Sequence, residues 1–281
     1  ESLVSAEPKI QFHIVMTLTN HPEFTVLNDL SYPDQNLFNN AEVNMQKTTY
    51  YTDLSLERFI NNPRHIEVQV VGDSHGNAIH IGERDCSLQR RHQKVIEESP
   101  AILLNDETRA KLHDVAVKAT KYLKYEGAGT FEFLADDKQN IYFMEMNTRL
   151  QVEHPVSEMV SGIDIVELMI KVAEGEKVPP QESIKFRGHA IECRITAEDP
   201  NSFLPCPGKV VQWMVPGGRN VRVDSHVYTN YVVPPHYDSM IGKLIVWGRD
   251  RNKAINIMKR ALAEFEVEGI KTTIPFHQKM M

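Results

Sequence analysis

Residues 143–158 read FMEMNTRLQVEHPVSE, and the alternation of polar and apolar residues predicts an extended segment with two different faces. The polar positions are Glu145, Asn147, Arg149, Gln151 and Glu153. Because side chains alternate between the two faces of a strand, all five would point to one side. A solvated strand could carry such a face. Two carboxylates, two amides and a guanidinium on one side of a largely apolar segment favour a functional site instead.

A second segment strengthens this interpretation. Residues 129–134 (GTFEFL) place Glu132 between two phenylalanines, and the DDKQN segment that follows has the composition of a turn. The resulting hairpin would set Glu132 opposite Glu145. With the amide oxygen of Asn147, these carboxylates would form an all-oxygen site that suits Mg²⁺ or Mn²⁺ rather than zinc. Two facing carboxylates repel each other unless a cation lies between them.

Residues 89–94 (QRRHQK) supply six adjacent hydrogen-bond donors and no carboxylate. Surface runs of charge usually mix the two signs, so this run favours a cradle for an anion over a solvated face. A lysine ammonium is a compact charge that suits phosphate oxygens, which makes Lys94 a candidate ligand for phosphate.

The local patterns also predict secondary structure elsewhere. The alternating segment 65–71 (HIEVQVV) should be a strand with Ile66, Val68 and Val70 on one face. Residues 105–125, 163–175 and a last segment after Asp250 should be helices, the first capped by Asn105 or Asp106. The core-facing stripe of the first helix would comprise Leu112, Val115, Ala116, Ala119, Tyr122 and Leu123.

Composition excludes several classes of protein. The chain has 281 residues, 41% of them hydrophobic and 25% charged, which is enough for one large or two ordinary domains. The net charge of −7 provides no basic footprint for nucleic acid. The three cysteines lack metal-type spacing and are typical of reduced thiols in a cytoplasmic protein. We find no apolar run of membrane-spanning length and no signal peptide.

Three sequence motifs resemble those of one protein family. Residues 83–101 (ERDCSLQRRHQKVIEESPA), residues 143–158 and residues 187–200 (RGHAIECRITAEDP), in this order, resemble biotin carboxylase. This is the ATP-grasp component of acetyl-CoA carboxylase and related biotin-dependent carboxylases. The resemblance implies an α+β fold, with an ATP-grasp body over residues 55–187 that holds the ATP, metal and bicarbonate site. A shortened biotin carboxylase C-terminal domain would follow over residues 188–281.

Residues 1–54 do not share this resemblance, and we assign them as a segment of unknown role in which residues 14–18 could form a strand. No glycine precedes Gly72. A glycine-rich phosphate loop needs residues without a Cβ where backbone approaches phosphate. We therefore expect that the family's usual N-terminal domain and glycine-rich lid are missing.

The resemblance also implies the chemistry: ATP-dependent carboxylation of biotin with bicarbonate, by way of carboxyphosphate. Glu153 matches the family's base, and the other residues matched to catalysis are Arg149, Lys94 and Arg194. The bicarbonate and biotin site would comprise Gln93, Lys94, Arg149, Gln151, Val152, Glu153 and Arg194. The ATP contacts would comprise Glu57, Ile60, His65, Gln89, His92, Glu132 and Glu145. The metal ligands would be Glu132, Glu145 and Asn147.

Structural roles compete with some of these assignments. His65 could be only a hydrogen-bonded residue at the end of a strand, Arg149 could only hold Glu145 or Glu153 in an ion pair, and Glu192 could pair with Arg194 on one face of its strand. No biotin-acceptor Met-Lys-Met motif occurs, so the resemblance implies a separate biotin carboxyl carrier protein, carboxyltransferase subunits and, as a candidate assembly, a homodimer. The process would be fatty-acid synthesis through acetyl-CoA carboxylase.

Two other functions remain as alternatives. The chain could be a catalytically inactive fragment that keeps half of the site. It could also be another ATP-grasp ligase of the carbamoyl-phosphate synthetase type, although the RRHQK and HAIECRI motifs disfavour this reading.

Overall fold

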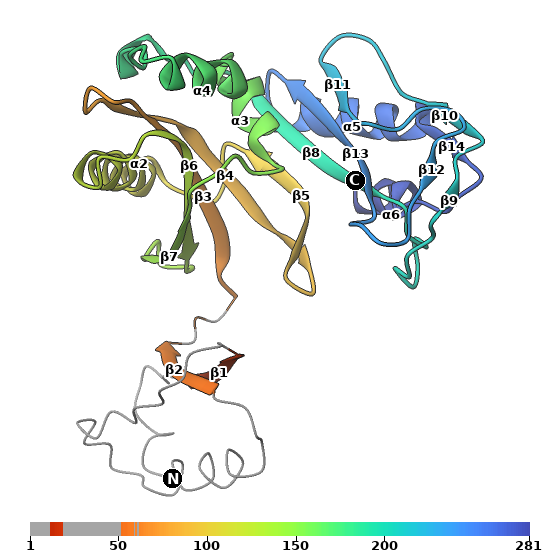
Figure 1. The fold of residues 1–281 in the computed structure, drawn as a ribbon, viewed down its shortest axis with the longest axis horizontal. Coiled ribbons are helices and arrows are strands. Elements are labelled where there is room, and N and C mark those ends of the chain that lie inside the picture. The colour runs from red at the N-terminus through yellow and green to blue at the C-terminus, as the bar shows by residue number, and fades with distance from the viewer. Residues whose placement is uncertain (1–11, 19–51, 59, 61) are drawn as a thin grey trace, which may run out of the picture. The chain divides into compact units, whose positions relative to one another are not determined.

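The computed structural model describes residues 12–18, 52–58, 60 and 62–281 (Figure 1). The chain divides into two units, Glu1–Asn61 and Asn62–Met281. In the first unit, β1 (Phe12–Leu18) pairs antiparallel with β2 (Thr52–Arg58). The strand predicted at residues 14–18 is therefore confirmed.

An eight-stranded antiparallel sheet forms the centre of the second unit, in the order β11-β13-β8-β5-β4-β3-β6-β7. The strands are β3 (Arg64–Gly72), β4 (Ala78–Arg90), β5 (Gln93–Ser99), β6 (Gly127–Ala135), β7 (Ile141–Asn147), β8 (His189–Thr196), β11 (Val221–Asp224) and β13 (Met240–Gly248). The pairing of β5 with β8 joins the two predicted domains in one continuous sheet (Figure 1). The predicted boundary near residue 188 thus falls just before β8.

The helices are α2 (Asp106–Tyr122), α3 (His154–Ser161), α4 (Ile165–Ala173), α5 (Arg251–Glu264) and α6 (Ile274–Met280), with a short 3-10 turn η1 (Gln181–Ser183). Two small ladders complete the unit: β9 (Gly208–Lys209) with β12 (Val232–Val233), and β10 (Gln212–Met214) with β14 (Glu266–Glu268). None of the helices in the described part of the chain has both the length and the apolar character needed to cross a lipid bilayer.

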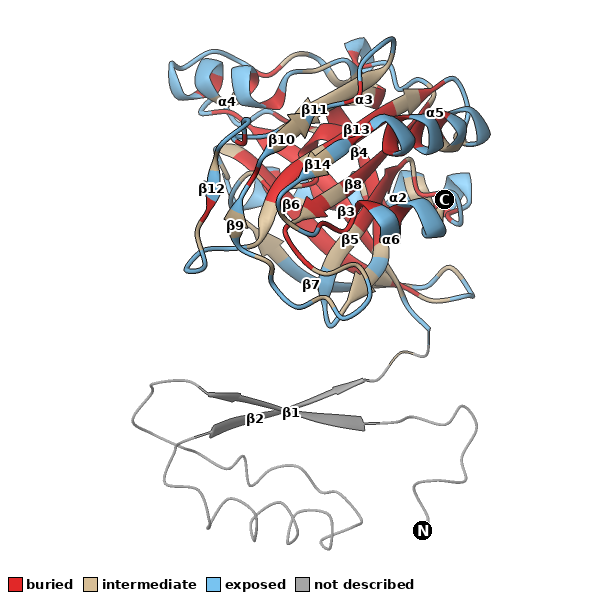
Figure 2. Cartoon of the chain, turned by 90° about the vertical axis from the view of Figure 1, so that its right-hand side faces the viewer, coloured by how far each residue is buried: buried red, intermediate tan, exposed pale blue. Residues whose placement is uncertain are grey.

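Helices α2 and α4 cover opposite faces of the sheet formed by β3, β4 and β6. Ile66, Val68 and Val70 pack in one cluster with Leu112 and Ala116 of α2, as the alternation in β3 predicts. Val71 of β3, which has the opposite parity, packs instead in the cluster around α4. Figure 2 shows the buried residues concentrated along these central strands. Glu67 and Gln69 of β3, which share the parity of Val71, therefore lie on the face turned away from α2.

Side-chain caps define where two helices begin. Asn105 accepts a hydrogen bond from the Thr108 N–H at 2.8 Å, which confirms the predicted cap of α2. Asp250 caps α5 in the same way through the Lys253 N–H at 2.8 Å. The predicted helix at 163–175 corresponds to α4.

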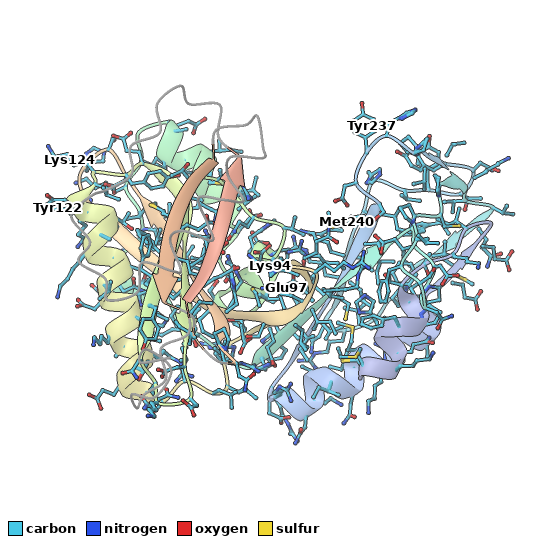
Figure 3. The ribbon with its side chains drawn as sticks, turned by 90° about the horizontal axis from the view of Figure 1, so that it is seen from below. Lys94, Glu97, Tyr122, Lys124, Tyr237 and Met240 are labelled. Carbon is cyan, nitrogen blue, oxygen red and sulfur yellow. The ribbon has the colours of Figure 1, made fainter. Side chains whose placement is uncertain are left out.

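The predicted core stripe of α2 is only partly right. Leu112 and Ala116 are buried, but Val115 is exposed and Tyr122 is 89% exposed. Figure 3 shows Tyr122 on the side of α2 that faces away from the sheet. The stripe is wrong at these positions, and at Leu123, because one flat sheet face can cover only a narrow band of a helix.

The prediction that residues 143–158 form one continuous strand is wrong beyond Asn147. Pairing with β6 ends where Thr130 meets Asn147, so the following residues have no strand partner in this sheet. Pro155 then lies in the first turn of α3, where its fixed φ favours a helix start. Glu153 consequently sits at the N-terminus of α3 rather than on a strand.

Strand β7 is also the edge of the sheet, although its sequence is largely apolar. A register shift between Glu132 and Phe133 leaves Met144 without a cross-strand partner. Such a bulge interrupts the alternation of faces. Phe143 and Met144 are accordingly both exposed.

Candidate active site

Lys94 of β5 contacts three carboxylates of the candidate site. Its ammonium donates to Glu132 Oε1 at 3.1 Å, to Glu153 Oε1 at 2.8 Å and to Glu67 Oε1. These acceptors come from β6, the N-terminus of α3 and β3. Burial by itself would lower the pKa of Lys94, but the surrounding carboxylates, chiefly Glu67 and Glu153, outweigh it and raise the pKa. The lysine is therefore a permanent cation in the wall of the site.

Arg194 of β8 provides the second cation. Its Nε donates to Glu97 Oε1 at 2.5 Å, and its terminal nitrogen donates to Glu153 Oε2 at 2.9 Å. Glu153, with a side chain that is 2% exposed, is thus held with one oxygen on Lys94 and the other on Arg194. A carboxylate fixed between two cations is preorganised for proton transfer to or from a ligand placed beside it.

A cavity of about 550 Å³ opens in front of this trio. All seven residues that the sequence predicts for the bicarbonate and biotin site line it: Gln93, Lys94, Arg149, Gln151, Val152, Glu153 and Arg194. Its far wall comes from residues that sequence reasoning did not select, such as Phe203, Ser239 and Met240. Figure 3 shows Lys94 and Glu97 on β5, with Met240 across from them on β13. The two predicted domains therefore share the cavity.

The predicted metal ligands lie beside this cavity. Glu132 and Glu145 are cross-strand partners, as predicted for the hairpin. The side-chain nitrogen of Asn147 donates to Glu132 Oε1 at 2.9 Å and to Glu145 Oε1 at 3.1 Å. One donor group therefore lies between two carboxylates, which is where a divalent cation would also be favoured. The donor set fits a hard cation such as Mg²⁺, with Asn147 turned so that its oxygen faces the ion.

Glu132 also contacts His65. The imidazole Nε2 lies 2.9 Å from Glu132 Oε2 and 3.1 Å from Glu67 Oε1. Burial lowers the pKa of His65, but the hydrogen bonds to these carboxylates outweigh burial and raise the pKa to about 9. His65, Glu67 and Glu132 lie close enough to hold a metal ion together. A protonated imidazole has no free lone pair, however, so His65 acts as a cation within this cluster at neutral pH.

The predicted anion cradle is the tip of the β4–β5 hairpin. Arg91 and His92 form its two-residue turn with φ of 50° and 64°, which are turn angles that non-glycine residues seldom adopt. Gln89 donates to the Cys86 carbonyl at 2.9 Å, and the Arg90 guanidinium lies 4.2 Å from the centre of the Phe203 ring. His92 lines the cavity and Gln89 does not.

Comparisons with known proteins follow the same division of the chain. Residues 31–181 match the family model described as carbamoyl-phosphate synthase L chain, ATP binding domain, and residues 192–281 match the biotin carboxylase C-terminal domain. The biotin carboxylase of Nostoc sp. is 57% identical over 228 residues, which are 80% of this chain and 51% of that protein.

Solved structures agree. The Campylobacter jejuni biotin carboxylase, in a β,γ-ATP complex, superposes with a TM-score of 0.81 at 63% identity, covering 86% of this chain and 54% of that chain. This chain belongs to the biotin carboxylase family.

A second structural relative was solved with ligands. The biotin carboxylase domain dimer of Hydrogenobacter thermophilus 2-oxoglutarate carboxylase, in complex with MgADP, ADP and bicarbonate, has a TM-score of 0.79 at 51% identity. It covers 81% of this chain and 51% of that chain. This chain spans about half the length of the curated biotin carboxylases that it matches.

The match to the ATP-binding model of the family begins at residue 31, earlier than the resemblance that we read from about Ser55. Glu57 and Ile60 belong to the first unit, and the side chain of Glu57 lies outside the described residues. Their role as ATP contacts stays a prediction.

Sequence reasoning missed the buried support of this candidate site. Arg84 is fully buried and donates to Glu67 Oε2 at 2.9 and 3.1 Å. It also donates to Gln69, Ser157, Thr130 and Gln151 at 2.7–3.2 Å. Although burial would raise the pKa of Glu67, the charges of Arg84 and Lys94 and the hydrogen bond from His65 hold it well below its usual range. The polar parity of the HIEVQVV segment, with Glu67 and Gln69 on one face, is the signal that could have found it.

The expected Glu192–Arg194 ion pair is wrong. Arg194 pairs with Glu97 and Glu153 instead, because the neighbouring strand β5 and the N-terminus of α3 bring those carboxylates to its guanidinium. Both carboxylate oxygens of Glu192 are buried without a hydrogen-bond partner among the described residues. The Arg149 alternative of an ion pair is not seen either: its guanidinium donates to the Asn147 side-chain oxygen at 3.2 Å.

Proposed function

We propose that this chain carries the catalytic face of a biotin carboxylase, which uses ATP and bicarbonate to carboxylate biotin on a carrier protein. The observation that carries the proposal is the Lys94–Glu153–Arg194 arrangement in the wall of a cavity lined by all seven predicted bicarbonate and biotin residues. The family membership and the relative solved with MgADP and bicarbonate support it.

In the first step Glu153 would act as the base. Bicarbonate is a poor nucleophile, so its proton must leave as its oxygen bonds to the γ-phosphorus and the bond from that phosphorus to ADP breaks. The proton would pass to a Glu153 oxygen. The Lys94 ammonium would then also interact with the phosphoryl oxygens, where negative charge accumulates, and not only with its carboxylate partners. The product of this step is carboxyphosphate.

In the second step Arg194 would act on biotin. Carboxyphosphate releases CO₂ and phosphate, and the phosphate takes the proton from N1 of biotin. The ureido oxygen then gains negative charge as N1 attacks CO₂. Arg194 can stabilise that oxygen because its guanidinium faces the cavity from β8 while Glu97 holds its Nε. Gln151 and Val152 lie on the same wall and would border the bicarbonate.

Glu132, Glu145 and Asn147 would hold Mg²⁺ or Mn²⁺, which neutralises phosphate charge when it is bound. The MgADP complex of the 2-oxoglutarate carboxylase domain supports magnesium. Glu132 keeps its other oxygen on His65, so the carboxylate is anchored from behind.

The wider assignment follows the family. We propose a separate biotin carboxyl carrier protein, carboxyltransferase subunits and a homodimer, in the cytoplasm, with acetyl-CoA carboxylase and fatty-acid synthesis as the process. The domain dimer of the 2-oxoglutarate carboxylase supports the dimer.

A catalytically inactive fragment is the alternative function. It is favoured by the absence of glycine before Gly72, because the phosphates then lack a glycine-rich loop among the preceding residues. A third reading, a carbamoyl-phosphate synthetase type of ligase, is disfavoured by the match of residues 192–281 to the biotin carboxylase C-terminal domain.

The test is ADP release by the purified chain with MgATP and bicarbonate, with and without free biotin. Biotin-stimulated release that is lost in Glu153→Gln supports the proposal. Glu268→Gln is the matched control, because Glu268 is exposed on β14. No release from a chain shown to be folded by circular dichroism would favour the inactive fragment. Unchanged release in Glu153→Gln would remove Glu153 as the base.

A further inference from the structure

Behind the cavity, two glutamates face each other in the interior of the sheet. Glu97 of β5 and Glu192 of β8 are cross-strand partners, and each is 0% exposed. Directly opposed residues of an antiparallel pair share a face, with Cβ atoms about 5 Å apart. The sheet therefore buries two carboxyl groups side by side.

Most of their oxygens have no hydrogen-bond partner. Glu97 Oε1 accepts from Arg194, but Glu97 Oε2 and both oxygens of Glu192 are unpaired within the described part of the chain. An ionised carboxylate without a partner in the interior is strongly unfavourable, and a neutral acid is the usual outcome. A proton on one member would give the pair the donor that its oxygens lack.

The cations nearby already have partners. Lys94 is bonded to Glu67, Glu132 and Glu153, and Arg194 to Glu97 and Glu153. Lys243, which faces this region from β13, donates to the Val152 carbonyl at 2.8 Å and lies 3.7 Å from Asp224. Glu67, Glu97, Glu132 and Glu153 thus each contact a cation, whereas no described cation contacts Glu192.

We propose that Glu192 is a neutral carboxylic acid in the folded chain at neutral pH, that it shares its proton with Glu97 Oε2, and that it thereby positions Arg194. With Glu192 neutral, Glu97 stays ionised and remains the acceptor of the hydrogen bond from the Arg194 Nε. If Glu192 were also ionised, its negative charge would compete with Glu153 for the Arg194 guanidinium. The value of this position for catalysis rests on the proposed function, whereas the protonation state does not.

The pKa directions agree with the geometry. Burial raises the pKa of Glu192 well above its usual range, and the neighbouring Glu97 raises it further, against smaller opposing effects of Lys243 and Arg194. Burial also raises the pKa of Glu97, to about 7, with Arg194 opposing and Glu153 adding to the rise. Because Glu97 has the Arg194 guanidinium as a partner and neither oxygen of Glu192 has one among the described residues, Glu192 is the member that should hold the proton.

Infrared spectroscopy of the complete chain tests the protonation state. At neutral pH the wild type and the exposed-site control Glu268→Gln should show a carbonyl stretch of a protonated carboxylic acid that Glu192→Gln lacks. Glu97→Gln should keep this band but shift it, because the acceptor of the shared proton has changed. No such band in the wild type, or a band that survives in Glu192→Gln and vanishes in Glu97→Gln, would overturn the proposal.

Stability gives a second readout. An acid whose pKa is raised by folding makes the folded state bind more protons, so the wild type should lose stability relative to Glu192→Gln as pH rises from about 5 to 9. Glu268→Gln should follow the wild type at every pH. Since glutamine has the shape and the donor of the neutral acid, a Glu192→Gln chain that fails to fold, or that stays parallel to the wild type, also contradicts the proposal. None of these results depends on enzymatic activity.

Discussion

Replacing Arg84 by methionine should be among the most destabilising single changes in this chain. The guanidinium is fully buried and bonded to Glu67, to Gln69 and to three further side chains. Methionine fills part of the space but leaves Glu67 with a buried charge that, among the described residues, only Lys94 and His65 compensate. Removal of one partner of a buried ion pair costs about 3–5 kcal/mol. We expect a loss in this range.

The assay is denaturant unfolding followed by circular dichroism and by tryptophan fluorescence. Trp213 and Trp247 lie in β10 and β13, so fluorescence reports on the part of the unit beyond β8. The matched control is Arg249→Met, an 85% exposed arginine with one ion pair to Asp250, which should lose no more than about 1 kcal/mol.

A double variant sharpens the test. If the cost comes from the uncompensated charge, Arg84→Met combined with Glu67→Gln should recover part of the loss, so the two substitutions should not be additive. A loss below about 1 kcal/mol in Arg84→Met, or full additivity in the double variant, would refute the view that the ion pair supports the site.

Three further changes have defined outcomes. The raised pKa of His65, about 9, means that its stabilisation is present below about pH 6.5 and lost as pH rises through 9; His65→Gln should therefore remove this pH dependence of the unfolding free energy, and an unchanged profile would contradict it. Burial would raise the pKa of Glu83, but hydrogen bonds and charges from His113 and Arg109 outweigh it and lower the pKa to about 2. The stabilisation from Glu83 is therefore present above about pH 4.5 and is lost toward pH 2. Glu83→Gln should make the unfolding free energy less dependent on pH in this acid range, and equal midpoints of acid unfolding in the wild type and the variant would count against this. In Gly188→Ala a Cβ would lie 2.5 Å from the Trp247 ring at φ +67°, so thermal unfolding should show a loss of several kcal/mol, larger than in Gly76→Ala, which has similar φ but open space; equal losses would refute the packing argument.

Short-range features of this chain could be predicted from its sequence. The hairpin that sets Glu132 opposite Glu145 depends on a five-residue turn and on two alternating strands that are adjacent in sequence. The caps at Asn105 and Asp250 depend on one side chain and a backbone N–H three residues away. The seven residues predicted for the bicarbonate and biotin site came from the family resemblance, and the structure brings all seven together in the wall of the cavity.

The order of the strands in the sheet decided which charged side chains pair with one another. Glu97 and Glu153 reach Arg194 only because β5 lies beside β8 and because the chain leaves β7 to begin α3 next to both. The sequence determined which side chains are polar within apolar strands, since alternation is local. Only the tertiary structure decided which of them pair, because the partners are far apart along the chain. Burial in that sheet makes Arg84 a fully paired cation and leaves Glu192 without a partner among the described residues, and the sequence neighbours of these two residues do not indicate either outcome.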